Sequence, residues 1–188
     1  MRITGGTARG IRLRVPNRRQ IRPATDRLRE SVFSSLGPCV EGMRIMDLFA
    51  GTGAYGLEAL SRGAESVTFV EKDRNAIACL ESNIRAVAKS LNRNDLRTVV
   101  AHADVLNWRP PPGRKFNLVF ADPPFSRLDS LIKPLLQFVS QLPKLGGRLC
   151  LVLEVPGQYE PAQAGWIVER RIGKGSEQPT CCLMTCVT

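Results

Sequence analysis

The sequence has little of several features on which common functions depend. Its 188 residues include one histidine, His102, and its six cysteines contain no C-x-x-C pair. Zinc sites of the usual ligand spacing are therefore not expected. Cys181 and Cys182 fall on a predicted strand, where neighbouring side chains point to opposite faces, so we expect no metal there. We interpret His102 as structural and the cysteines as reduced core residues of a cytoplasmic protein.

Long apolar runs are also missing. None approaches the roughly 18 residues that a membrane-crossing helix requires, and residues 1–20 are basic and interrupted by Gly and Pro. The sequence therefore predicts neither a membrane span nor a secretory signal. With 43% hydrophobic residues, the chain can form one domain with a full core. Nothing in it indicates an obligate protein partner.

Lysine is absent from the first thirty residues, which contain nine arginines. Only Asp26 and Glu30 oppose them, so this segment carries +7 (nine minus two) of the formal net charge of +10. The arginine guanidinium is a planar fork of donors that fits phosphate, which favours nucleic-acid contacts over a merely solvated arm. The arginines expected to bind RNA are Arg18, Arg19, Arg22, Arg27 and Arg29.

The pattern of glycines and apolar residues divides the chain into a basic arm, residues 1–24, and a main domain, residues 25–188. In the arm we expect a hairpin of two short strands, 2–4 and 11–15. A helix is predicted from Thr25 to the Gly-Pro pair at 37–38, with an apolar face formed by Leu28, Val32, Phe33 and Leu36. Arg27 and Arg29 fall outside this face, and we expect both to be free to bind.

From residue 44 onward, apolar runs typical of strands alternate with helical patterns. Strands are predicted at 45–49, 66–71, 98–102, 116–121, 148–154, 166–172 and 180–187, and helices at 54–62, 73–89 and 128–142. This alternation indicates a parallel sheet with right-handed crossovers. We expect an α/β fold, a mostly parallel seven-stranded sheet with helices on both faces, closed by a hairpin of the last two strands.

Acidic residues lie at the ends of four consecutive predicted strands: Asp47, Glu71, Asp104 and Asp122. Open parallel sheets bind ligands outside these carboxyl ends. Residues 51–56 read Gly-Thr-Gly-Ala-Tyr-Gly, a G-x-G-x-x-G pattern between a strand and a helix. Gly51 and Gly53 are expected to form a tight turn that lets a ligand approach the backbone, while Glu71 accepts hydrogen bonds from ribose hydroxyls.

The nature of this ligand depends on Asp47. Its carboxylate, four residues before Gly51, would repel the pyrophosphate of a dinucleotide. S-adenosylmethionine carries an ammonium and a sulfonium, which tolerate the acid, and its adenosine suits Glu71 and Asp104. An NAD-dependent oxidoreductase would explain the glycines and Glu71 but not Asp47.

The tetrapeptide Asp-Pro-Pro-Phe at residues 122–125 follows a buried strand. Proline fixes its own φ and restricts the preceding residue, so the Asp122 side chain and the Pro123 carbonyl become two acceptors aimed at one spot. Such a pair suits an NH2 group, with Pro124 and Phe125 beside it. The alternative is an ordinary strand-ending turn in which Phe125 is a core residue.

Residues 47–53, Glu71 and residues 122–125 together resemble the class I S-adenosylmethionine-dependent amino-methyltransferases. Residues 21–30 and 56–64 resemble signature segments of the RsmD family, bacterial enzymes that methylate guanine N2 in 16S ribosomal RNA. The resemblance runs from the N-terminus to about residue 154. It implies a Rossmann-like class I methyltransferase fold, S-adenosyl-L-methionine as cofactor, and 16S ribosomal RNA, naked or within the assembling 30S subunit, as substrate.

The resemblance also implies residue roles. Asp47, Gly51, Gly53, Glu71 and Asp104 would bind the cofactor. Asp122 and the Pro123 carbonyl would accept the N–H bonds of the guanine amine, and Phe125 would stack on the base. The same acceptor pair serves any exocyclic amine, so an adenine-N6 or cytosine-N4 methyltransferase is one alternative. A non-catalytic RNA-binding module is another.

Overall fold

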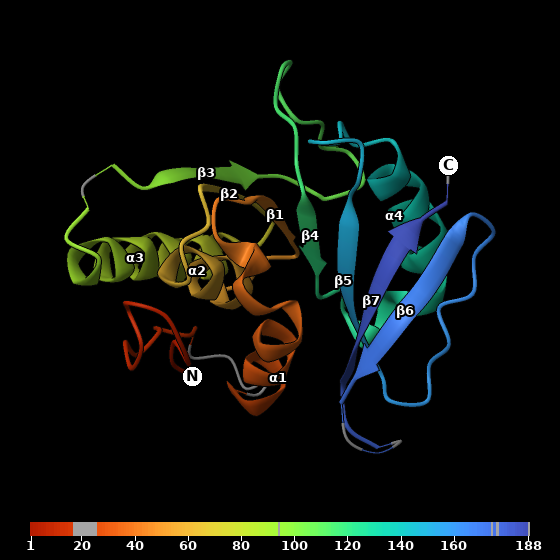
Figure 1. Cartoon of the computed structure of the whole chain (residues 1–188), viewed down its shortest axis with the longest axis horizontal. Helices are drawn as coiled ribbons and strands as arrows, with labels where there is room; N and C mark the ends of the chain where they lie inside the picture. Colours follow the sequence, from red (N-terminus) through yellow and green to blue (C-terminus); the bar gives the residue numbers. More distant parts are fainter. Residues whose placement is uncertain (17–25, 94, 174, 176, 188) are drawn as a thin grey trace.

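The computed structural model describes residues 1–16, 26–93, 95–173, 175 and 177–187. A single sheet with the strand order β3-β2-β1-β4-β5-β7-β6 organises the molecule (Figure 1). The strands are β1 (Arg44–Leu48), β2 (Ser66–Glu71), β3 (Arg97–His102), β4 (Leu118–Ala121), β5 (Cys150–Val155), β6 (Trp166–Ile172) and β7 (Thr180–Cys186). β1 to β5 are parallel, whereas β7 runs antiparallel between β5 and β6. This confirms the predicted mostly parallel seven-stranded sheet and its closing hairpin.

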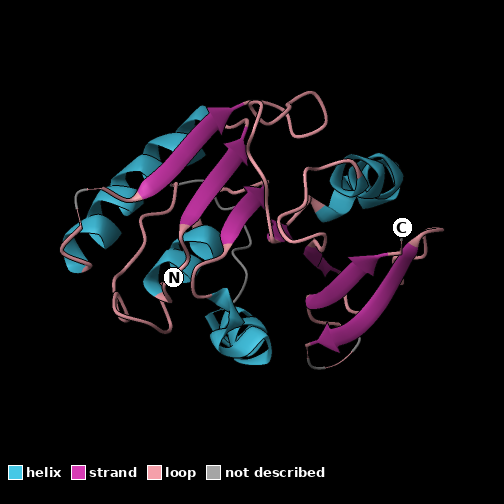
Figure 2. Ribbon diagram, turned by 45° about the horizontal axis from the view of Figure 1, so that its top comes forward, coloured by secondary structure: helices cyan, strands magenta, loops and turns pink. Residues whose placement is uncertain are grey.

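Helices lie on both faces of the sheet, as predicted (Figure 2). They are α1 (Asp26–Leu36), α2 (Ala54–Ser61), α3 (Arg74–Ser90) and α4 (Leu128–Ser140), with short 3-10 turns at Gly37–Val40 and Phe125–Arg127. The core residues of α1, α2 and α3 belong to one hydrophobic cluster and those of α4 to a second. Within the described part of the chain, no helix is long and apolar enough to cross a membrane.

The strands supply both hydrophobic clusters because successive side chains point to opposite faces. In β1, Ile45 packs with α1 to α3 and Met46 with α4. In β7, Cys181 and Cys182 separate in the same way, as predicted for neighbours on a strand. Strands buried on both faces are typical of sheets covered by crossover helices.

Local signals explain several element ends. The Asp73 side chain accepts hydrogen bonds from the backbone N–H groups of Asn75 (2.7 Å) and Ala76 (3.1 Å), so it caps α3 as predicted. Gly37 ends α1 with a φ of 62°. β4 begins at Leu118 rather than at 116 because the Phe116 N–H turns to the Pro143 carbonyl.

The N-terminal segment differs from the expected hairpin. Its two predicted strands reduce to a single antiparallel bridge between Arg2 and Arg12. Ile3, Ala8 and Leu13 are buried in the cluster that α1 to α3 form, so residues 1–13 pack onto the main domain instead of extending from it. The predicted division at residue 24 and the helix start at Thr25 lie outside the described residues.

A buried ion-pair network fastens this segment to the helices. Glu58 of α2 contacts Arg29 of α1 (3.3 Å) and Arg62 (2.9 Å), and it accepts hydrogen bonds from the Thr4 N–H and hydroxyl (2.7 Å each). Arg29 also pairs with Asp26 (3.0 Å). The expectation that Arg29 is free to bind is therefore wrong, because its side chain is fully buried against these acids.

We predict that Glu58→Gln lowers the free energy of unfolding by about 3–5 kcal/mol, because it removes the buried charge that lies between Arg29 and Arg62 and leaves Arg29 with Asp26 alone. Urea denaturation would measure this loss. The matched control is Glu65→Gln, which breaks partly exposed pairs with Arg44 and Arg97 and should cost far less, because solvent screens both pairs. Equal effects of the two substitutions would contradict a special role for the buried network.

Candidate active site

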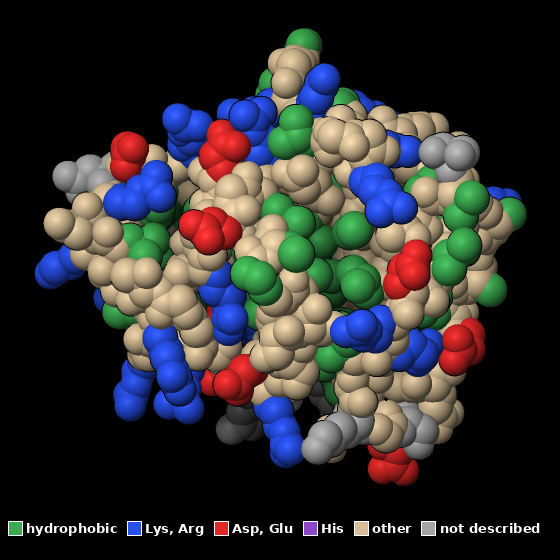
Figure 3. All heavy atoms as spheres, viewed as in Figure 1, with side chains coloured by type: hydrophobic (Ala, Val, Ile, Leu, Met, Phe, Trp, Pro, Cys, Tyr) green, Lys and Arg blue, Asp and Glu red, His purple; other side chains and the backbone are tan. Residues whose placement is uncertain are grey.

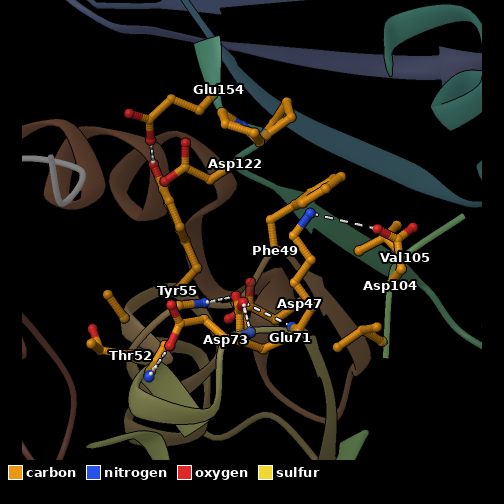
Figure 4. A pocket seen from close by; sticks show the side chains of 18 of the residues that line it. Asp47, Phe49, Thr52, Tyr55, Glu71, Asp73, Asp104, Val105, Asp122 and Glu154 are labelled. Carbon is orange, nitrogen blue, oxygen red and sulfur yellow. Dashed lines mark hydrogen bonds and ion pairs between the residues drawn. The ribbon is translucent and has the colours of Figure 1, made fainter. Parts of the chain in front are cut away.

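A cavity of about 460 Å³ opens at the carboxyl ends of β1 to β5. This volume lies in the range of cofactor and small-ligand sites. Of the residues predicted to form the site, the cavity is lined by Asp47, Gly51, Glu71, Asp104, Asp122, Pro123, Pro124 and Phe125. The predicted candidates from four separate strand ends thus come together around one space (Figure 4).

The register of the parallel strands accounts for this gathering. Leu48 of β1 pairs with Val70 and with Ala121, and Ala121 pairs with Leu153. The acids Glu71, Asp122 and Glu154 each follow one of these three partners directly. They therefore stand at one level of the sheet, one step beyond the last row in which β1 pairs with β2 and β4, and β4 with β5.

Asp47 occupies the floor of the site with 3% of its surface exposed. It accepts a hydrogen bond from the Gly56 N–H at the start of α2 (2.9 Å). Burial raises the pKa of this carboxyl to about 8, and the nearby charge of Glu71 adds to the rise. An uncompensated carboxyl in this position favours a cationic ligand.

Glu71 ties the glycine loop to the end of β2. One oxygen accepts the Gly51 N–H (2.8 Å), and the other accepts the Lys72 and Asp73 N–H groups (2.8 Å each). A carboxylate has about four acceptor positions, so it can still receive a hydroxyl from a ligand. This geometry is compatible with the predicted ribose contact.

The two glycines predicted to bind cofactor have different surroundings. Gly51, with φ at 54°, lines the cavity, and a Cβ there would come no closer than 3.9 Å to the Phe49 carbonyl oxygen. At Gly53, with φ at 82°, a Cβ would lie 2.3 Å from Leu80 Cδ1. Gly53 therefore allows the loop to pack on α3, and a direct cofactor contact at Gly53 stays a prediction.

Asp104 and Lys72 form an opposite wall of the cavity. Lys72 Nζ lies 3.6 Å from Asp104 Oδ2, and the Leu106 N–H donates to the other oxygen of this carboxylate (3.1 Å). His102 is exposed and its ring contacts the Lys72 carbonyl oxygen (3.1 Å), outside the set of lining residues. This place is consistent with the structural interpretation of His102.

All four residues of the Asp-Pro-Pro-Phe segment line the cavity. The Asp122 N–H donates to the Leu48 carbonyl (3.4 Å), and the Arg127 N–H donates to the Pro124 carbonyl (2.9 Å), which fixes both ends of the turn. Within the described ranges, no protein group donates to the Asp122 carboxylate or to the Pro123 carbonyl. Both acceptors therefore remain available to a ligand.

Sequence reasoning missed two buried residues of the wall, Tyr55 and Glu154. The Tyr55 hydroxyl donates to Glu154 Oε2 (2.8 Å) and lies 3.2 Å from Cys181 Sγ, while its ring stacks on Phe120 with 5.0 Å between centroids. Glu154 could have been found, because it is a fifth acid at the end of a predicted strand. Tyr55 occupies an x position of the G-x-G-x-x-G pattern. The pattern allows any residue there, so it does not point to Tyr55.

The predicted RNA-binding arginines are only partly described. Arg27 is exposed on α1, and Arg29 is buried. Arg18, Arg19 and Arg22 lie outside the described residues. No grouping of His, Cys, Asp or Glu suited to holding a metal ion occurs among the residues that the structure describes.

The raised pKa of Asp47 predicts how stability depends on pH. The folded state holds the Asp47 proton more tightly than the unfolded chain does, so the free energy of unfolding falls as the pH rises toward about 8. Asp47→Asn removes this contribution. Relative to the wild type, the variant should gain at least about 1 kcal/mol between pH 5.5 and 8.5, measured by urea denaturation.

The matched control for this experiment is Asp73→Asn, which changes an exposed cap in the same way. Its difference from the wild type should vary by less than about 0.5 kcal/mol over the same pH range. A constant difference for Asp47→Asn as well would mean that Asp47 is ionised throughout.

Comparison with known proteins gives consistent matches. A family model described as "Conserved hypothetical protein 95" matches residues 1–183. The chain is 41% identical to "Ribosomal RNA small subunit methyltransferase D" of Escherichia coli (strain K12) over 127 residues, 68% of this chain and 61% of that protein. This alignment thus spans less than two thirds of the relative. "Putative rRNA methyltransferase YlbH" of Bacillus subtilis (strain 168) is 33% identical over 172 residues, 91% of each chain.

A solved structure agrees with these relatives. The chain superimposes on "Putative methyltransferase yhhF from Escherichia coli" with a TM-score of 0.79 and 29% identity, covering 100% of this chain and 98% of the other. The likeness extends over both the parallel strands and the closing hairpin. It confirms the predicted Rossmann-like class I methyltransferase fold.

Proposed function

Because the chain belongs to the RsmD family, whose model is described as "Conserved hypothetical protein 95", we propose that it transfers a methyl group from S-adenosyl-L-methionine to the exocyclic N2 of a guanine in small-subunit ribosomal RNA. The observation that carries this proposal is the pair of available acceptors, the Asp122 carboxylate and the Pro123 carbonyl, beside an acid-lined cavity. An amine that offers two N–H bonds matches that pair.

The cavity has the chemistry that S-adenosylmethionine requires. When bound, this cofactor supplies a methyl group already activated by the sulfonium. A cation at the floor would favour the ionised form of Asp47, which would then pair with the cationic end, and Glu71 and Asp104 offer acceptors for the adenosine. A pyrophosphate would gain no such pairing with Asp47, which disfavours a dinucleotide and with it an oxidoreductase.

The residues of the chain act mainly by orienting the amine. A guanine amine is a poor nucleophile, because its lone pair is delocalised into the ring. Acceptance of its two N–H bonds by Asp122 and Pro123 favours a pyramidal nitrogen whose lone pair faces the methyl group. Phe125, which lines the cavity with Pro124, would stack on a base that has left its helix.

Contacts with the RNA backbone would come from basic side chains outside the cavity. Arg27 is exposed on α1, and Arg18, Arg19 and Arg22 precede it in the sequence. Lys and Arg side chains also surround the margin of the face in Figure 3, while hydrophobic side chains gather in its central hollow. Arginine-rich surfaces of this kind bind phosphates with an affinity that falls as salt rises.

Family membership, rather than the acceptor pair, supports guanine over other bases. Adenine N6 and cytosine N4 present the same NH2 group, so methylation of either base in DNA or RNA is the second candidate. A non-catalytic RNA-binding module would explain the basic side chains. It would not explain six acids lining one cavity.

We predict that Asp122→Ala lowers the rate of methyl transfer at least about 100-fold, because it removes one of the two acceptors that orient the amine. The dissociation constant for S-adenosylhomocysteine should change by less than about tenfold. Transfer of labelled methyl to small-subunit RNA, naked and in particles, and calorimetric titration with S-adenosylhomocysteine measure the two quantities.

Glu71→Ala is the matched comparison for Asp122→Ala. It should weaken cofactor binding by about tenfold or more, because a charged acceptor is removed. The rate of methyl transfer at saturating cofactor should fall less than it does in Asp122→Ala. Equal losses of binding and transfer in Asp122→Ala would instead assign Asp122 a structural role.

Charge reversal of the arm should separate RNA binding from cofactor binding. The double variant Arg18→Glu with Arg19→Glu should weaken binding to a small-subunit RNA fragment. The slope of log affinity against log salt concentration should become shallower by about 1 for each arginine that no longer binds a phosphate. Arg148→Glu, an exposed change before the amino end of β5 and opposite the cavity, is the control. Unchanged affinity and salt slope in the double variant would exclude the arm from RNA binding.

A further inference from the structure

Glu154 and Tyr55 line the cavity but do not contribute to orienting the amine. Glu154 is the last but one residue of β5, and Asp122 directly follows β4, its neighbour in the sheet. Tyr55 reaches from α2 across the cavity wall, and in Figure 4 the carboxyl groups of Asp122 and Glu154 both point toward its hydroxyl. The Tyr55 hydroxyl donates to Glu154, at 2.8 Å, so it holds one of the two acids in place.

The charged and titratable groups around this pair come from four elements. Asp47 of β1, with Glu71 beyond it, adds negative charge near Asp122. Arg29 of α1 adds positive charge near Glu154, and Tyr55 of α2 and Cys181 of β7 complete the surroundings. Both Tyr55 and Cys181 remain protonated near neutral pH, because burial raises their pKa well above the usual values.

Burial and mutual repulsion make the two acids share a proton. Burial, with the charges of Glu154 and Asp47, raises the pKa of Asp122 well above its usual value. Burial raises the pKa of Glu154 to about 7, against the opposing effects of the Tyr55 hydroxyl and Arg29. Because the Tyr55 hydrogen bond favours the ionised form of Glu154, the shared proton resides mainly on Asp122.

We propose that Glu154, held by Tyr55, is a positioning residue whose negative charge makes Asp122 the base that takes the proton of the amine. The proposal rests on the proposed methyl transfer and adds to it a destination for the proton. A second acid beside Asp122 is not needed to orient an amine, since Asp122 and Pro123 suffice for that. Its place next to the base, only 3% exposed, is explained by this role.

The reaction leaves one proton to be accepted. As the bond between nitrogen and the methyl carbon forms, the carbon–sulfur bond breaks and its electron pair stays on sulfur, giving S-adenosylhomocysteine. The nitrogen then has four bonds and a positive charge, and it must release one proton. Asp122 can take this proton only after the pair has lost the proton that it shares, so it acts as the base above the pH at which the pair titrates, and it later returns the proton to water.

The direct test measures the protonation of Asp122 without any methyl transfer. In protein labelled with 13C at the Asp and Glu carboxyl groups, the Asp122 signal is assigned by its loss in Asp122→Asn and titrated by NMR. In Glu154→Gln, which retains an acceptor for Tyr55, the pKa of Asp122 should fall by at least about one unit. In Tyr55→Phe, the ionised form of Glu154 loses a donor, so the higher apparent pKa of the pair should rise.

The second readout is the pH profile of single-turnover methyl transfer at saturating cofactor. Glu154→Gln should move the acid limb to lower pH and reduce the plateau rate at least about tenfold, because Asp122 becomes a weaker base. Tyr55→Phe should move the limb in the opposite direction. Glu160→Gln, which removes an exposed acid paired with Arg171, should leave the profile unchanged.

The two readouts separate failure of this inference from failure of the proposed function. Unshifted Asp122 titration in Glu154→Gln, or superimposable pH profiles for both variants, would overturn the inference while methyl transfer stands. If the wild type transfers no methyl group to any RNA, the proposed function fails and the proton role fails with it, whatever the titration shows. Opposite shifts in the two variants, together with transfer, would establish the role.

Discussion

The parallel register of β2, β1, β4 and β5 is the constraint on which the site depends. Backbone pairing places the ends of these strands at one level, and each strand carries an acid at or next to its end. Side chains that are up to 107 residues apart in the sequence (47 to 154) therefore converge without any direct bond between them. A shift of one strand by a single residue would turn its acid to the other face, away from the cavity.

Buried Glu58 and the buried acids of the cavity differ in how their charge is balanced. Glu58 is surrounded by cations of the chain itself, Arg29 and Arg62, and it holds the N-terminal segment against α1 and α2. The acids of the cavity have no such set of cations around them, and burial raises the pKa of Asp47 and that of Glu154. The fold thus retains buried acids at a place where a cationic ligand can favour their charged form.

Much of the fold and part of the site could be predicted from local patterns. β2 and β6 begin and end at the predicted residues, and the acids and the Asp-Pro-Pro-Phe turn were found because each follows a recognisable strand. The burial of Arg29 could not be predicted, because it depends on Glu58, which lies 29 residues away on another helix. The contact between Tyr55 and Glu154 joins residues 99 apart, and no periodicity within either segment reports such a distance. The N-terminal hairpin was predicted from two short apolar segments joined through glycines, and the structure keeps one antiparallel bridge of it, but the packing of Ile3, Ala8 and Leu13 on the core could not be predicted.

The central claim is that the acceptor pair at Asp122 and Pro123 presents a guanine amine to a methyl donor. Nucleoside mass spectrometry of small-subunit ribosomal RNA, after incubation with the protein and isotopically labelled S-adenosylmethionine, tests it most directly. We predict label in N2-methylguanosine, at a rate that Asp122→Ala lowers at least about 100-fold. Label in methyladenosine or methylcytidine, or no label with either naked RNA or assembled particles, would contradict it.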